Sequence, residues 1–148
     1  MDIQPYLFFD GNCAEAMRFY ERALGGKLET LMKVSDAPPS EEMPPGNPDL
    51  VLHACLVVEG RMLMASDAMD GACADGTPAE SRPYEGMKNF GVALSYPTVA
   101  EARRAYDALS EGATVTMPMD KTFFAEAFGM LTDRFGTPWM ISGPAPQQ

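Results

Sequence analysis

The sequence predicts an α+β fold made of two copies of one strand–helix–three-strand (βαβββ) module. Strand and helix periodicities follow one another in the same order twice, both helices open with a capping sequence, and the two helices resemble each other. A shift of 86 positions superposes Glu15, Ala16, Arg18, Tyr20 and Glu21 on Glu101, Ala102, Arg104, Tyr106 and Asp107. Two unrelated amphipathic helices remain the alternative, because surface helices share much of their composition.

The first module opens with an apolar run of strand length, residues 3–9, followed by turn residues. Asn12 with Glu15 three residues later resembles a capping box, so a helix is predicted over residues 13–24. Apolar side chains recur on one face of this helix, and the glycine pair at 25–26 ends it.

Three strands are predicted after this helix, at residues 28–34, 50–58 and 61–66. The first is separated from the second by residues 35–49, whose five prolines exclude regular structure. The second and third form a hairpin around the turn at 59–60.

The second module repeats this order. Residues 92–95 form a short strand, and Thr98 with Glu101 makes another capping box for a helix that ends before Gly112. Three strands follow, at residues 114–117, 127–133 and 138–142, the last two joined by a turn at Phe135-Gly136 in which Asp133 bonds backbone amides.

These elements divide the chain into a first module at residues 1–67, a linker loop at 68–88, a second module at 89–143 and a tail at 144–148. The linker is aperiodic and rich in Gly, Ala and Pro. Loops of this length inside a compact protein tend to be linkers or lids over a site.

Composition limits the classes of partner. Eleven basic and twenty-one acidic side chains give a net charge of −10, which opposes binding to nucleic acid and to anionic membranes. Cys13, Cys55 and Cys73 are odd in number and far apart, which fits neither a disulfide framework nor a paired-cysteine zinc site. With no targeting segment and no long apolar run, we expect a cytoplasmic protein.

Three stretches, PYLFFDGN near the start, HACLVVEGRMLMASD in the middle and FGMLTDRFGTPWM near the end, are similar to PhnB-like proteins, sometimes labelled demethylubiquinone methyltransferase-like. These belong to the vicinal-oxygen-chelate superfamily of glyoxalases, bleomycin-resistance proteins and extradiol dioxygenases. The resemblance covers nearly the whole chain apart from the two loops and the tail. It implies a curved mixed sheet, the glyoxalase fold, with helices on its convex side, and a homodimer.

The resemblance also bears on metal chemistry. Enzymes of this superfamily hold a divalent metal with two histidines and a glutamate on inward-facing strand positions, which correspond here to Pro5, Gly91 and Met140. None of these residues offers the imidazole or carboxylate that such metals need, so we expect neither a metal nor another cofactor at these positions. No nucleotide-binding motif supports the methyltransferase label.

Strand alternation then predicts which side chains line the cup. If Gly91 points inward, Ala93 and Ser95 do so too, while Val92 and Leu94 pack on a helix. The same parity turns Pro5, Leu7 and Phe9, and Pro138, Met140 and Ser142, inward. With Thr122 and Phe124 at the rim, the candidate ligand-binding residues are Leu7, Phe9, Ala93, Ser95, Thr122, Phe124 and Met140. This lining suits a small, partly apolar ligand.

His53 and Asp67 are the candidate catalytic residues. His53, the only histidine, is either a hydrogen-bonded core residue or a general base. Asp67 is either a cap at the end of a strand or a partner of His53 in a relocated site, to which Glu126 would contribute; the role of Tyr6 stays open.

Three functions follow. The first is a small-molecule-binding protein without the usual metal site. The second is a lyase, isomerase or dioxygenase-like enzyme with a site around His53. The third is an interaction module without a small ligand.

Overall fold

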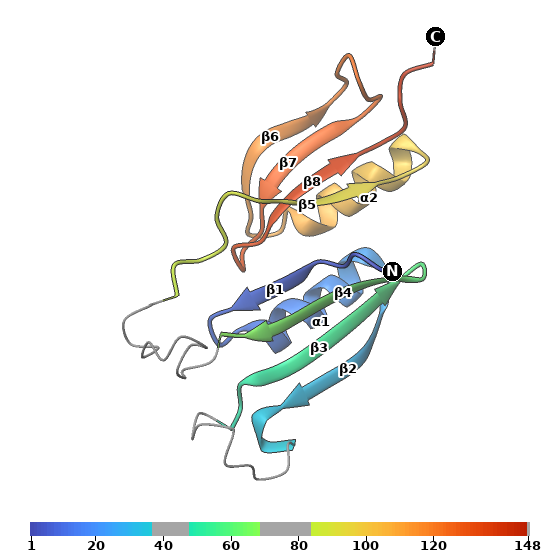
Figure 1. The fold of residues 1–148 in the computed structure, drawn as a ribbon. Coiled ribbons are helices and arrows are strands. Elements are labelled where there is room, and N and C mark those ends of the chain that lie inside the picture. Colours follow the sequence, from blue (N-terminus) through green and yellow to red (C-terminus); the bar gives the residue numbers. More distant parts are fainter. Residues whose placement is uncertain (37–47, 69–83, 148) are drawn as a thin grey trace. The chain divides into compact units, whose positions relative to one another are not determined.

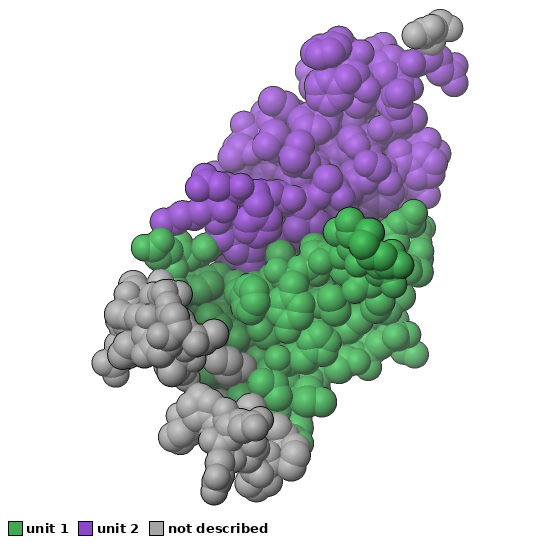
Figure 2. Space-filling view, in the orientation of Figure 1, with its two compact units in different colours: residues 1–86 green, residues 87–148 purple. Residues whose placement is uncertain are grey.

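The computed structural model describes residues 1–36, 48–68 and 84–147. Most of the proline-rich loop and of the predicted linker, including Cys73, therefore lies outside the described residues. The chain divides into two compact units, Met1–Gly86 and Met87–Gln148 (Figure 2). Each unit is described by itself below.

The first unit is a mixed four-stranded sheet with one helix on one of its faces (Figure 1). Its sheet order is β1-β4-β3-β2, with β1 parallel to β4 and the other pairs antiparallel. Its elements are β1 (Tyr6–Phe9), α1 (Cys13–Leu24), β2 (Lys27–Lys33), the short 3-10 helix η1 (Val34–Asp36), β3 (Val51–Val58) and β4 (Arg61–Asp67).

The second unit has the same organisation (Figure 1). Its sheet order is β5-β8-β7-β6, again with one parallel pair, between β5 and β8. The elements are β5 (Val92–Ser95), α2 (Val99–Leu109), β6 (Thr114–Asp120), β7 (Phe128–Thr132) and β8 (Pro138–Ser142). The predicted pair of βαβββ modules is therefore confirmed.

Two strand bounds differ from prediction by more than one residue. β1 begins at Tyr6 rather than at residue 3, and Ile3 is 89% exposed. β6 runs three residues past the predicted end at Met117, through Pro118 to Asp120. Proline is tolerated there because β6 is an edge strand, where one side of the backbone needs no partner.

The helices begin in different ways. α2 has the predicted capping box, in which Thr98 Oγ1 accepts a hydrogen bond from the Glu101 amide at 3.2 Å and donates one to the Glu101 carboxylate at 2.9 Å. The predicted box of α1 is wrong, because Asn12 makes no side-chain cap. The amide of Cys13 instead donates to Asp67 Oδ1 at 2.9 Å, so a residue of β4 caps the helix from across the fold.

The core of each unit lies between its helix and one face of its sheet. In the first unit Phe9 and Leu56 are buried with Met17 and Tyr20 of α1. In the second unit Trp139, Ile141 and Leu109 are buried. No helix in the described part of the chain is both long enough and apolar enough to cross a membrane.

Candidate functional site

Each sheet has one face toward its helix, and we call the other its open face. In the first sheet Leu7 and Phe9 are 1% and 0% exposed, and the ring of Phe9 lies 6.4 Å from that of Tyr20 in α1. These two residues therefore belong to the helix-facing core, and the prediction that they face the open side is wrong. Tyr6, Leu7, Phe8 and Phe9 are all apolar in character, so the strand has no alternation from which its faces can be recognised.

The open face of the first sheet carries the residues that alternate with Leu7 and Phe9 along β1. Tyr6 and Phe8 are 38% and 54% exposed, and strand register puts them on the same face as Met64 and Ser66 of β4. Cys55 pairs with Met64, so β3 turns Cys55 and, two residues away, His53 to this face. The sequence reasoning left Tyr6 open and did not single out Phe8.

Tyr6 and His53 contact each other on this open face. The Tyr6 hydroxyl lies 3.1 Å from His53 Nδ1, and the two rings stack with centroids 5.8 Å apart at 29°. Strand β4 lies between β1 and β3, so the Tyr6 side chain reaches across it. His53 is half-buried and hydrogen-bonded, as the structural reading predicted, but it lies on the open face of the sheet rather than in the core.

The structure does not bring Asp67 to His53. Asp67 is 1% exposed, and its two carboxylate oxygens accept from the backbone amides of Cys13 at 2.9 Å and Val51 at 2.8 Å. It lies on the side of α1, whereas His53 is on the open face. Glu126, the third residue of the predicted relocated site, forms an ion pair with Lys121 at 3.5 Å within the second unit. Asp67 is therefore the predicted cap.

The second sheet follows the predicted alternation. Ala93 and Ser95 pair with Met140 and Ser142 of β8 on the open face, and the Ser95 and Ser142 hydroxyls lie 3.3 Å apart. Trp139, one residue from Met140, is 1% exposed and donates its indole N–H to Asp133 Oδ2 at 2.8 Å. Asp133 also bonds two backbone amides of the β7–β8 turn, as predicted. The role of Ala93, Ser95 and Met140 in ligand binding stays a prediction.

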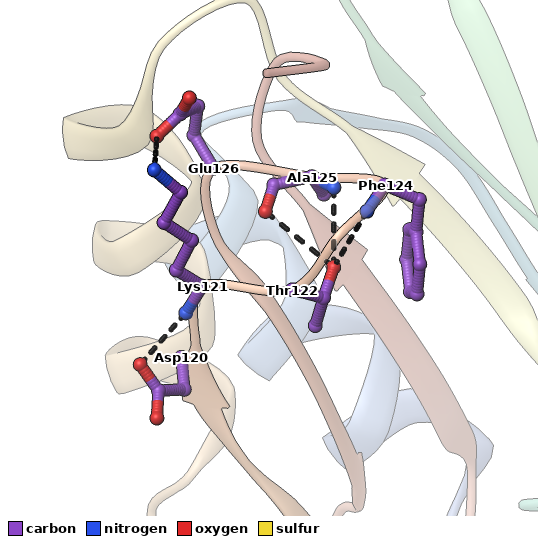
Figure 3. A network of polar contacts seen from close by, with 6 residues as sticks. All are labelled: Asp120, Lys121, Thr122, Phe124, Ala125 and Glu126. Atoms are coloured by element: carbon purple, nitrogen blue, oxygen red, sulfur yellow. Dashed lines mark hydrogen bonds and ion pairs between the residues drawn. The ribbon is translucent and has the colours of Figure 1, made fainter.

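Thr122 and Phe124 lie in the loop between β6 and β7 (Figure 3). Thr122 Oγ1 accepts from the amides of Phe124 at 3.3 Å and Ala125 at 3.1 Å, so its hydroxyl fixes the loop. Phe124 is 47% exposed, and its ring meets Phe128 of β7 edge to face at 5.0 Å. Phe128 pairs with Ser142 and so shares the open face, a contact that the sequence reasoning missed.

The positions that the resemblance assigns to a metal, Pro5, Gly91 and Met140, carry no suitable donors. Gly91 and Met140 lie close together, since a Cβ built on Gly91 would be 3.7 Å from Met140 Sδ. Neither these residues nor Pro5 offers an imidazole or carboxylate, and a single thioether is a poor ligand for hard divalent metals. In residues 1–36, 48–68 and 84–147, no three His, Cys, Asp or Glu side chains form a group able to hold a metal ion.

The two described cysteines are free, buried thiols. Burial, and to a lesser degree the charge of Asp67, raises the pKa of Cys13 from 9.0 to about 12. Burial and the nearby Glu29 raise the pKa of Cys55. Because the thiolate is the nucleophile, neither is suited to covalent catalysis at neutral pH.

The chain is similar to several known proteins over almost its full length. Residues 2–141 match the family described as the Glyoxalase/Bleomycin resistance protein/Dioxygenase superfamily. Protein YjdN of Escherichia coli (strain K12) is 35% identical over 150 residues, which cover 96% of this chain and 95% of YjdN. Among solved structures, protein PA1353 from Pseudomonas aeruginosa is 42% identical, with a TM-score of 0.80 and 97% of each chain covered.

A more distant structure has the same fold. The putative 3-demethylubiquinone-9 3-methyltransferase, PhnB protein, from Bacillus cereus is 20% identical, with a TM-score of 0.73, and covers 97% of this chain and 100% of its own. At this identity the likeness shows the fold alone.

Proposed function

Because this chain belongs to the glyoxalase/bleomycin resistance protein/dioxygenase superfamily, we propose that it binds a small, partly apolar molecule without the superfamily's usual metal site. One observation carries the proposal. Two of the positions at which the fold family holds its metal are a glycine and a methionine, Gly91 and Met140, which lie side by side on the second sheet. The third, Pro5, has the parity of the buried Leu7 and Phe9 and so does not belong to the open face. A site with such residues can surround a ligand but cannot ligate it through a divalent ion.

The open faces support an apolar ligand. On the second sheet Met140 pairs with Met130, and Phe128 lies on the same face two residues before Met130 in β7. The ring of Phe124, in the loop before β7, meets that of Phe128. Methionine side chains adapt to different shapes, and aromatic rings offer large rigid contact areas. The hydroxyls of Ser95 and Ser142 supply a few polar groups, as ligand sites usually have.

A small-molecule screen followed by ¹H–¹⁵N NMR tests this function. We expect neutral, partly apolar compounds to shift amide signals of β5, β7 and β8, or of the open face of the first sheet. Met140→Gln should weaken binding to the second sheet severalfold, because it replaces an apolar contact with a polar group. Arg103→Gln, on the exposed surface of α2, is the matched control. A screen in which no compound shifts an open-face signal would contradict the proposal.

An enzyme is the second candidate, and the Tyr6–His53 contact is the observation that favours it. A histidine with a hydrogen-bonded hydroxyl is a common means of moving a proton, as lyases and isomerases require. In this version Asp67 has no part, because its carboxylate is engaged with backbone amides. Turnover of a bound compound that is lost in His53→Ala would establish it, and turnover unchanged in that variant would exclude it.

We also propose that the protein is a homodimer. β1 and β5 are edge strands within their own sheets, and exposed edges with apolar residues favour pairing with another chain. Light scattering should give twice the chain mass of 16.1 kDa. A mass equal to that of one chain across the tested concentrations would contradict it.

A further inference from the structure

The Tyr6–His53 pair lies beside the uncharged side chains of β1 and β4 on the open face of the first sheet. The open-face positions of β1 and β4 are Tyr6, Phe8, Met62, Met64 and Ser66, none of which is charged. We propose that this open face of the first sheet binds a flat, uncharged molecule bearing a hydroxyl or carbonyl oxygen, held at that oxygen by Tyr6 and His53. This inference rests on the proposed function and names the ligand class of one site.

The Tyr6–His53 hydrogen bond can form in two ways, depending on which nitrogen of His53 carries the proton. Each way leaves one hydrogen-bond donor of the pair available to a ligand. When the Tyr6 hydroxyl donates to His53 Nδ1, the other ring nitrogen, Nε2, carries the proton of the neutral imidazole. When Nδ1 carries that proton and donates to the Tyr6 oxygen, the hydroxyl proton of Tyr6 is available instead and Nε2 is an acceptor. In both arrangements the pair can therefore donate a hydrogen bond to a ligand hydroxyl or carbonyl oxygen. It can also accept a hydrogen bond from a ligand hydroxyl.

The rings around the pair define the shape of the ligand. Phe8 lies 5.1 Å from Tyr6 with its plane tilted by 37°, and Tyr6 stacks on His53 with centroids 5.8 Å apart. Three rings therefore lie in sequence from Phe8 through Tyr6 to His53. Such a series favours an aromatic or conjugated ligand, because aromatic groups gain most from stacked or edge contacts with other rings.

Charge and exposure restrict the ligand further. A carboxylate or phosphate beside the pair would find no cation among these positions of β1 and β4, and its desolvation would be uncompensated. On β2 the register turns Lys27 to this face, but Lys27 pairs with Val57, four residues along β3 from His53. Tyr6 and Met62 are each 38% exposed and Phe8 is 54% exposed, so the side chains are accessible within the unit. These features select a neutral phenol-like or conjugated carbonyl compound.

2-Naphthol is the test probe, because it is flat, neutral at pH 7 and carries one hydroxyl. It is titrated into ¹⁵N-labelled protein and into the variants Tyr6→Phe and His53→Phe, which keep the rings and remove the polar atoms. Tyr106→Phe, which removes a hydroxyl from α2 of the second unit, is the matched control. We expect shifts at β1, β3 and β4, and binding roughly fivefold weaker in Tyr6→Phe and His53→Phe, the worth of one net hydrogen bond.

The double variant should lose no more than either single one, because both changes remove the same coupled pair. Binding of equal strength in wild type and Tyr6→Phe would overturn the proposal. So would the absence of shifts on the first sheet at about 1 mM probe, a concentration that detects even weak affinity. Compounds from the screen that bind only to the second sheet would also overturn it, yet would leave the proposed function intact.

Discussion

The two units of this protein share an element order and a strand order, but they turn their first strands to opposite faces. In β5, Ala93 and Ser95 face the open side, five and three positions before Thr98, the residue that caps α2. In β1, Leu7 and Phe9 hold the corresponding positions before Asn12, yet they pack toward α1. The shift of 86 positions that aligns the helices therefore fails for the strands that precede them.

This difference changes what each helix packs against. Tyr20 and Tyr106 correspond under the same shift, but Tyr20 meets the ring of Phe9, whereas Tyr106 lies over Gly129. Tyr20 therefore contacts the first strand of its module, whereas Tyr106 contacts the third strand of the second module. A repeated sequence pattern thus preserves the helix while the strand beneath it adopts its own register.

The largest expected effect concerns the cap that only the first unit has. Asp67→Ala should lower the free energy of unfolding by about 3 kcal/mol, because two buried backbone amides lose a charged acceptor. Chemical denaturation measures the loss, and hydrogen exchange should show faster exchange at the first turn of α1. A loss below about 1 kcal/mol would mean that Asp67 does not hold α1 and β3 together.

The next effect concerns the packing of Tyr106. A Cβ at Gly129 would lie 2.7 Å from Tyr106 Cε2, so Gly129→Ala should destabilise the protein by about 1–3 kcal/mol. Gly91→Ala is the control, because its Cβ would meet nothing closer than 3.7 Å, and its effect should stay within about 0.5 kcal/mol. Equal stabilities of the two variants would show that the ring and strand are not in close contact.

The raised pKa of Cys13 predicts that the stability of the first unit falls at alkaline pH. Its folded pKa of about 12 exceeds the ordinary 9.0, so the folded state holds the proton more tightly. The contribution to stability is complete below pH 9 and declines by about 1.4 kcal/mol per pH unit as the pH rises from 9 toward 12. Cys13→Ala should abolish this part of the decline in denaturation curves. A parallel pH dependence in wild type and variant would contradict the burial of the thiol.

The smallest effect concerns the local cap of the second unit. Thr98→Ala should cost about 1 kcal/mol, because it removes one side-chain cap from an exposed helix end. Thr98→Ser keeps the hydroxyl and should retain most of the stability. A loss as large as that of Asp67→Ala would remove the distinction between a buried cap and an exposed one.

Local signals predicted much of the fold. The bounds of α1, β5 and β8 agree with those read from the sequence, because caps, glycine stops and turn residues mark them within a few positions. The faces of β5 were predictable since large and small residues alternate there. The faces of β1 were not, because Tyr6, Leu7, Phe8 and Phe9 offer no such alternation.

Long-range contacts could not be predicted in the same way. The Asp67 cap joins residues 54 apart, and the Tyr6–His53 contact joins residues 47 apart. Each depends on strand order and register, which only the folded sheet fixes. Residue type alone suggests that His53 and Asp67 act together. The fold separates these two side chains, and His53 contacts Tyr6 instead.

Elemental analysis of untagged protein, purified without chelator, tests the central claim of metal-free ligand binding most directly. The wild type is measured beside His53→Ala, since His53 is the only imidazole in the chain. With glycine and methionine at the usual metal positions of the second sheet, we predict no stoichiometric divalent metal in either protein. A stoichiometric metal in the wild type that is lost in His53→Ala would contradict the account and identify a relocated metal site.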